Sequence, residues 1–101
     1  MPILREIKLD KEFESEVSNI FSYIESEFGE GYAKVFQIRL ARQIKLLANF
    51  PEMGQRNGGN FSLGLENLFH KLFRQNWIFY KFTDKEIKFL KIVNTKRDIK
   101  K

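Results

Sequence analysis

The 101-residue sequence contains no cysteine and a single histidine, His70. Without cysteine there is no disulfide, no thiolate metal site and no cysteine nucleophile, and we expect the chain to work in a reducing, cytoplasmic compartment. One histidine and no cysteine leave carboxylates as almost the only candidate metal ligands. The sequence therefore predicts neither a bound metal nor another cofactor.

Long apolar runs are also missing. Residues 1–12, MPILREIKLDKE, lack the apolar stretch of a signal peptide, and no segment approaches the roughly 20 apolar residues of a membrane span. We expect a soluble protein that makes no contact with a membrane. Hydrophobic residues make up 43% and aromatic residues 15% of the chain, which is enough for a core and argues against disorder. At this length we expect a single domain over residues 1–101, with a basic tail at 94–101 that is free to fray.

Positive charge is concentrated in the last third of the chain, whose overall net charge is +5. Residues 1–66 carry eight Lys/Arg and ten Asp/Glu, whereas residues 67–101 carry ten Lys/Arg and three Asp/Glu, so the two parts have net charges of −2 and +7. Such a field attracts a phosphate backbone or an acidic protein segment. A solubilising lysine surface would have the same composition.

The pattern of apolar residues predicts one strand and two helices in the first half of the sequence. Residues 3–9 alternate between apolar and polar side chains, as in a strand. Asp10 is a candidate N-cap, and apolar residues then recur at helical spacing until Gly29. Residues 33–47 repeat that spacing, and Pro51 ends this second helix. The two helices are expected to pack antiparallel because their connection is so short.

The second half of the sequence predicts strands. Residues 51–60 are rich in Gly and Asn and predict a long loop. Three runs rich in β-branched and aromatic residues follow at 68–73, 77–82 and 87–93, and the short segments between them permit only antiparallel hairpins. The expected fold class is α+β: an N-terminal strand, a two-helix antiparallel hairpin and a three-stranded antiparallel meander. We expect one curved antiparallel sheet with the helices on one face.

Four segments resemble motifs of the RelE/ParE toxin superfamily and occur in the order found there. Leu47–Gly54, LANFPEMG, resembles the L-x-x-F/Y-P-x-x-G junction that closes the second helix of these toxins. Trp77–Tyr80 resembles their y-x-i-x-Y strand, Ile87–Val93 the strand after it, and Asn94–Asp98 the basic h-x-x-R-x ending. The physical roles agree, because the proline of the first motif cannot continue a helix and its final glycine permits a sharp reversal.

The resemblance implies a growth-inhibiting toxin of a type II toxin-antitoxin system, of the kind associated with plasmid stabilisation. RelE-like members cut messenger RNA on the ribosome without a metal, using basic groups that bind the scissile phosphate and move protons. ParE-like members bind DNA gyrase and lack that set of residues. RelE-like proteins commonly have an Arg a few residues before the Tyr of the central strand. Aligned on Tyr80, this chain has Trp77 at or beside that place, which favours the ParE-like class.

A metal-independent endoribonuclease stays open as an alternative, because other basic residues could surround one phosphate. The candidate catalytic residues are His70, Lys71, Arg74 and Arg97. An unperturbed pKa near neutrality would suit His70 to general base catalysis. Its alternation with Leu68 and Leu72 along one strand face favours a structural or simply exposed histidine over a catalytic one.

Contact with the target or with nucleic acid is expected from Trp77, Tyr80, Lys81 and Lys96. Trp77 alternates with Phe79 and Lys81 along one strand face. Because the helices cover only one face of the sheet, this row is expected to be partly open and suited to stacking on a base or docking an antitoxin. Tyr80 belongs to the other row and is interpreted first as a core residue, and a solvated tail is the alternative for Lys96.

Three functions therefore remain: binding of gyrase, which we prefer, ribosome-dependent cleavage of messenger RNA, and an inactive binding module of the same fold. The partner expected in each toxin case is a cognate antitoxin, whose acidic segment would complement the basic last third of the chain. We expect it to anchor in a hydrophobic groove on the helical hairpin or on the open sheet face. The sequence leaves open whether the toxin forms a homodimer or a heterotetramer with its antitoxin.

Overall fold

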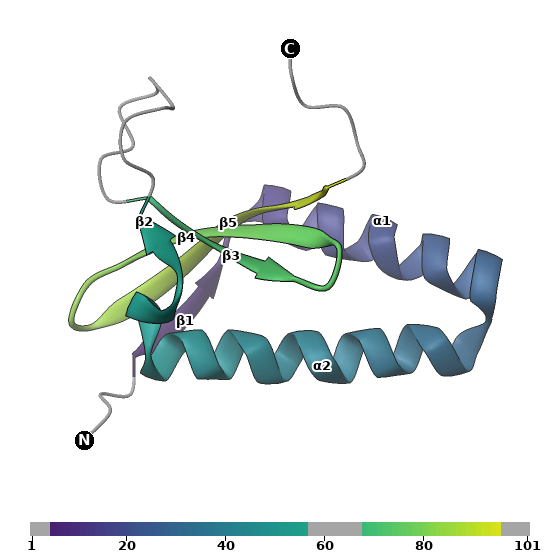
Figure 1. Ribbon diagram of the computed structural model, residues 1–101, viewed down its shortest axis with the longest axis horizontal. Coiled ribbons are helices and arrows are strands. Elements are labelled where there is room, and N and C mark those ends of the chain that lie inside the picture. Colours follow the sequence, from purple (N-terminus) through teal and green to yellow (C-terminus); the bar gives the residue numbers. More distant parts are fainter. Residues whose placement is uncertain (1–4, 57–67, 96–101) are drawn as a thin grey trace, which may run out of the picture.

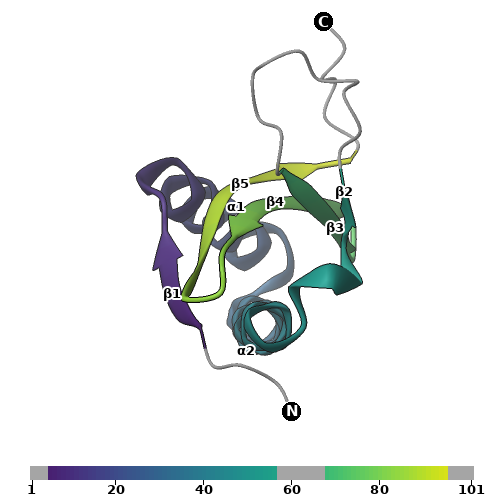
Figure 2. The same ribbon diagram turned by 90° about the vertical axis from the view of Figure 1, so that its left-hand side faces the viewer.

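The computed structural model describes residues 5–56 and 68–95 of the chain. It contains a five-stranded sheet in the order β1-β5-β4-β3-β2, with two helices packed against it (Figure 1). Along the chain the elements are β1 (Glu6–Leu9), α1 (Lys11–Phe28), α2 (Glu30–Asn49), the 3₁₀ turn η1 (Pro51–Met53), β2 (Gln55–Arg56), β3 (Phe69–Phe73), β4 (Asn76–Phe82) and β5 (Glu86–Asn94). The sheet curves over α2 (Figure 2). The predicted α+β fold, with a strand, a helical hairpin and a meander, is confirmed.

The two helices are separated by a single residue, Gly29. The Asp10 carboxylate accepts a hydrogen bond from the backbone N–H of Glu12, which starts α1 at the predicted place. Gly29 then adopts φ 99°, a conformation that side chains rarely tolerate, and both ends α1 and begins α2. The second helix begins at Glu30, earlier than the periodicity from Ala33 indicated, because Gly31 is taken into its first turn.

The sheet is mixed, so the expectation of a wholly antiparallel sheet is wrong for one pair. β1 lies parallel to β5, in a register that runs from Glu6 opposite Glu86 to Leu9 opposite Phe89. The three pairs β2–β3, β3–β4 and β4–β5 are antiparallel. Short turns force antiparallel pairing only between consecutive strands, whereas β1 and β5 are joined through both helices and the meander.

The predicted loop at residues 51–60 is wrong for its first part. Pro51–Met53 form the 3₁₀ turn, and Gln55–Arg56 pair with β3 as the edge strand β2. Proline suits the first position of such a turn, because its φ is already set and the N–H it lacks would have no partner there. Residues 57–60 lie outside the described part of the chain.

One core lies between the helices and the inner face of the sheet. Its most deeply buried large side chains come from both helices and from two strands, β4 and β5. They include Phe13, Leu47, Ile78, Tyr80 and Phe89. The alternation along β4 is the predicted one, because Ile78 and Tyr80 are fully buried whereas Trp77 and Phe79 are half-buried on the other face.

A β-bulge in β5 keeps the core continuous. The pairing of β4 with β5 shifts by one residue between Phe79 and Tyr80, which leaves Leu90 as the extra residue. The buried β5 residues are Ile87, Phe89 and Ile92. Their spacing of two and then three would put the third on the outer face of a regular strand, and the extra residue returns it to the core.

Candidate functional site

The outer face of the sheet carries an aromatic cluster. His70 of β3 lies opposite Phe79 of β4, and Leu72 lies opposite Trp77. The His70 ring meets the Trp77 ring edge-on, with centroids 5.2 Å apart, and its centroid is 6.1 Å from that of Phe79. Leu72 beside them is 48% exposed. We call these four residues the open-face cluster. Together they form a largely apolar surface that is partly exposed to solvent.

A row of lysines crosses the same face of the sheet. Lys8 of β1 lies opposite Lys88 of β5, which in turn lies opposite Lys81 of β4. Lys81 follows Phe79 by two residues, so the row runs beside the open-face cluster. Lys8 also forms an ion pair with Glu86 at 3.2 Å, and this hydrogen-bonded carboxylate raises the pKa of Lys8. The lysine row makes one side of the cluster positive.

Sequence reasoning identified Trp77 and Lys81 on this face but missed Lys8 and Lys88. Each alternates with apolar residues along its strand, and that alternation was visible in the sequence. What brings them beside Lys81 is the register of three strands, one of them paired in parallel from the opposite end of the chain. No local pattern contains that register.

Burial lowers the pKa of His70, which favours the neutral imidazole at pH 7. The ring packs between two aromatic side chains on the outer face of the sheet. Packing of this kind explains the residue as part of an aromatic surface.

The residues considered for a nuclease do not share one face. His70 points outward from β3, whereas Lys71 lies opposite Ile78, whose side chain is buried on the helix side. Arg74 lies in the turn between β3 and β4, where it adopts φ 57°. It lines a cleft between this turn and the two helices. Arg97, like the predicted contact residue Lys96, lies outside the described residues. The described residues of the set are therefore divided, with His70 on the outer face and with Lys71 and Arg74 on the helix side.

Tyr80, also predicted to contact the target, is fully buried and holds the junction after α2. Its hydroxyl donates a hydrogen bond to the Pro51 carbonyl oxygen. Burial raises the pKa of Tyr80 to about 12, so the phenol stays protonated at physiological pH. This is the geometry of a structural residue, in agreement with the interpretation of Tyr80 as core-facing.

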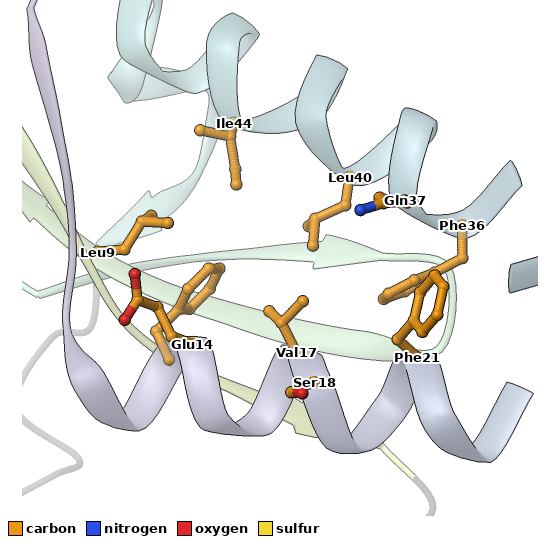
Figure 3. Close-up of a pocket in the computed structure, with 10 residues that line it drawn as sticks. Leu9, Glu14, Val17, Ser18, Phe21, Phe36, Gln37, Leu40 and Ile44 are labelled. Atoms are coloured by element: carbon orange, nitrogen blue, oxygen red, sulfur yellow. The ribbon is translucent and has the colours of Figure 1, made fainter. Parts of the chain in front are cut away.

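Two hollows lie on the helix side of the molecule. A groove of about 420 Å³ runs between α1 and α2, with Val17, Leu40 and Ile44 in its walls (Figure 3). A cleft of about 730 Å³ lies where the helical hairpin meets the β3–β4 turn, and we call it the hairpin cleft. Its lining residues include Tyr23, Phe28, Tyr32, Arg39, Arg74 and Asn76. None of the helices that the structure describes is long and apolar enough to cross a membrane.

Comparison with family models assigns this small α+β domain to the RelE/ParE toxin superfamily. The model of the family described as ParE toxin of type II toxin-antitoxin system, parDE, matches residues 7–99. The chain belongs to this family. No curated protein matches it.

Two solved structures are similar in fold. The first is the chromosomal ParDE toxin-antitoxin system from P. aeruginosa, with a TM-score of 0.73 and 16% sequence identity, covering 92% of this chain and 98% of that one. The second is the E. coli DinJ-YafQ toxin-antitoxin complex, with a TM-score of 0.58 and 15% identity, covering 91% of this chain and 93% of that one. The shared fold extends over almost the whole chain.

Proposed function

We propose that this chain, the toxin of a type II toxin-antitoxin system, inhibits growth in the cytoplasm by binding DNA gyrase, and that a cognate antitoxin neutralises it. The observation that carries the proposal is the separation of His70, on the outer face of the sheet, from Lys71 and Arg74, which lie on the helix side. General acid–base cleavage of RNA needs several basic groups within hydrogen-bonding reach of one phosphate. Membership of the ParE family supports the same choice.

The open-face cluster is the surface that we assign to the target. It offers Trp77, Phe79 and Leu72 as apolar contacts next to a lysine row, a combination typical of protein interfaces with a charged rim. Truncation of a large aromatic residue at the centre of such a surface commonly weakens binding by more than 1 kcal/mol. Trp77 is the natural residue to test.

The direct test is inhibition of purified gyrase by the purified chain, measured as loss of DNA supercoiling and as accumulation of cleaved DNA. We expect the wild-type chain to inhibit, and Trp77→Ala to need at least about tenfold more protein for the same effect. Ile38→Ala is the matched control, because Ile38 is 55% exposed on α2 and lines neither hollow. No inhibition by a folded wild-type chain would exclude gyrase as the target.

One observation favours a ribosome-dependent endoribonuclease as the second candidate. The lysine row beside half-buried aromatic rings is also a surface on which single-stranded RNA could stack its bases on the rings and pair its phosphates with the lysines. Induction of the chain in a bacterial host, with messenger RNA integrity and DNA breakage followed in the same cultures, separates the two candidates. Transcripts cut within codons, and spared when Lys81 and Lys88 are replaced by Ala but not when Lys34 is, would establish the nuclease.

A further inference from the structure

The hairpin cleft exposes an aromatic wall. Tyr23, Phe28 and Tyr32, at the end of the helical hairpin, are 61%, 59% and 68% exposed. Their rings form a chain, with centroids 6.4 Å apart from Tyr23 to Phe28 and 6.1 Å apart from Phe28 to Tyr32. Isolated exposed aromatics are ordinary, but three contiguous rings along a cleft offer a stacking surface to a flat, aromatic ligand.

Two guanidinium groups from distant parts of the sequence line the same cleft. Arg39 comes from α2 and Arg74 from the β3–β4 turn, and both residues are exposed. Within the part of the chain that the structure describes, neither has a carboxylate partner at ion-pair distance. Two arginines beside one hollow repel each other and attract an anion, and phosphate oxygens match their planar donors in pairs.

Asn76 adds a buried polar group to the lining of the cleft. Only 5% of this residue is exposed, and its Oδ1 atom accepts no hydrogen bond from any described residue. A buried acceptor without a donor costs free energy that a ligand bearing an N–H would recover. The occupant of the cleft is therefore expected to bring a hydrogen-bond donor as well as negative charge.

The size and the remaining lining of the cleft suit a small molecule. Its volume of about 730 Å³ lies within the roughly 300–1,000 Å³ range of pockets that enclose compact ligands. Ile20, Ile24 and Val35 add aliphatic surface to the aromatic wall. A largely apolar hollow with a few convergent polar groups selects a ligand that has a flat apolar body and a charged end.

We propose that the hairpin cleft binds a free nucleotide whose base carries an exocyclic amino group. In this arrangement the base stacks on the aromatic wall, the phosphates pair with Arg39 and Arg74, and the amino N–H donates to Oδ1 of Asn76. Each of the three features of the cleft is matched by one part of such a ligand. Inorganic phosphate lacks the ring, and an uncharged aromatic compound lacks the anion.

The nucleotide site is separate from the surface assigned to gyrase. Asn76 and Trp77 are neighbours in β4 but point to opposite sides of the sheet, the first toward the cleft and the second toward the open face. The two surfaces share no residue. The inference therefore goes beyond the proposed function and does not depend on it.

Titration calorimetry of the full-length chain with ATP tests the site. We expect saturable binding to the wild type, and an affinity at least about tenfold lower in Arg39→Gln/Arg74→Gln because the phosphates lose both partners. Tyr32→Ala should lower the affinity about fivefold or more through lost stacking. Arg42→Gln and Ile38→Ala are matched controls, since both residues are exposed on α2 and line neither hollow. Circular dichroism checks that each variant is folded.

Changes in the ligand separate the three contacts. Purine riboside triphosphate lacks only the amino group of ATP and should bind about fivefold more weakly or worse, because Oδ1 of Asn76 stays without a donor. Adenosine, which has no phosphate, and inorganic triphosphate, which has no base, should each bind at least about tenfold more weakly than ATP. GTP and CTP carry their amino groups at other positions, and the tightest of the three nucleotides identifies the preferred base.

Three results of these titrations would overturn the proposal. The first is the absence of saturable binding of ATP, GTP and CTP to the folded wild type. The second is equal affinity in the wild type and in the double arginine variant, or equal weakening in Arg42→Gln, which would mean binding elsewhere or general charge attraction. The third is inorganic triphosphate that binds as tightly as ATP, which would leave an anion site without base recognition.

Two further measurements test other occupants of the cleft. A labelled 12-nucleotide single-stranded RNA that needs both arginines, while free nucleotides do not bind, would assign the cleft to nucleic acid and overturn the proposal. A wild type that sediments as a dimer, a Tyr32→Ala variant that sediments as a monomer and no nucleotide binding would assign the aromatic wall to a second copy of the chain. Inhibition of gyrase is measured separately, so failure here leaves the proposed function intact.

Discussion

Gly54 shows why one residue of the junction motif is glycine. Its φ of −79° and ψ of 175° are extended and open to any residue, so the sharp reversal expected from the sequence is not the reason. A Cβ atom at this position would overlap the Tyr80 hydroxyl and come within 2.7 Å of the His70 carbonyl oxygen. Glycine is needed because Tyr80 must reach Pro51 past the backbone of residue 54.

Replacement of Gly54 by Ala is expected to lower the free energy of unfolding by roughly 1–3 kcal/mol, because the tyrosine or a backbone must move. Urea denaturation measures this. Gly31→Ala is the control: it lies in the first turn of α2, and beyond the adjacent backbone no atom lies within 4 Å of the added Cβ, so the stability of this variant should be unchanged or slightly raised. Equal effects at both glycines would contradict the explanation.

The pKa of Tyr80 predicts a loss of stability in strong base. The folded state holds the pKa at about 12 instead of 10.0. Below pH 10 the phenol is protonated in both states, whereas between pH 10 and 12 only the unfolded chain ionises, so stability falls as pH rises. The loss attributable to Tyr80 should reach roughly 2–3 kcal/mol near pH 12.

Urea denaturation of the wild type and of Tyr80→Phe across this range isolates the effect from the titration of lysines. The variant should be less stable at pH 7 by roughly 1–3 kcal/mol, since the Pro51 carbonyl loses its donor. The difference between the two proteins should narrow above pH 10. A constant difference would show that Tyr80 ionises equally in both states.

At the scale of the element, the bulge at Leu90 sets which side of β5 faces the helices. Deletion of Leu90 would reduce the spacing of Phe89 and Ile92 to two, so a regular strand without the bulge would keep both side chains in the core. We expect this variant to retain a cooperative transition in thermal denaturation followed by circular dichroism. Deletion of Lys88 instead places Ile87 and Phe89 on opposite faces of the strand and should abolish the cooperative transition. Loss of folding that is as complete in the Leu90 deletion as in the Lys88 deletion would contradict this explanation.

Arg5 joins three elements at the base of the sheet. Its Nε donates to the Thr83 carbonyl oxygen at 2.6 Å and its Nη1 to the Ala48 carbonyl oxygen at 3.2 Å. The guanidinium carbon lies 5.3 Å from the centre of the Phe82 ring. A planar group with several donors can meet the start of β1, the end of α2 and the β4–β5 turn at once.

Arg5→Lys is therefore not a conservative change. A single ammonium group cannot reproduce both hydrogen bonds and the ring contact, and we expect a loss of about 1 kcal/mol in unfolding free energy. Hydrogen exchange should show faster opening of the β1–β5 pairing before the rest of the sheet. Lys11→Ala, at the exposed start of α1, should leave that exchange unchanged.

At the scale of the whole molecule, the sheet separates the open-face cluster from the helix side, where the hairpin cleft lies. Trp77→Ala is expected to reduce toxicity while leaving antitoxin affinity within about twofold of the wild type. Growth curves with and without antitoxin, read beside the affinities, measure both. Equal loss of toxicity and of antitoxin affinity in this variant would contradict the assignment of the open face to the target.

Much of this architecture was predictable from the sequence, because it depends on local patterns. Helical spacing after Asp10, the break at Gly29 and the alternation of Ile78 and Tyr80 each reflect interactions between near neighbours. The resemblance in the junction and strand motifs correctly indicated the toxin superfamily. The inward direction of Tyr80 and the open position of Trp77 followed from alternation alone.

Tertiary structure alone decided what depends on register and on long-range contact. The parallel pairing of β1 with β5, and with it the lysine row, arises between segments about 80 residues apart. The convergence of Arg39, Arg74 and Asn76 on one cleft has the same origin, because the turn of a hairpin meets the end of two helices there. Local periodicity determines which side of an element is buried, whereas packing in three dimensions determines which exposed residues become neighbours.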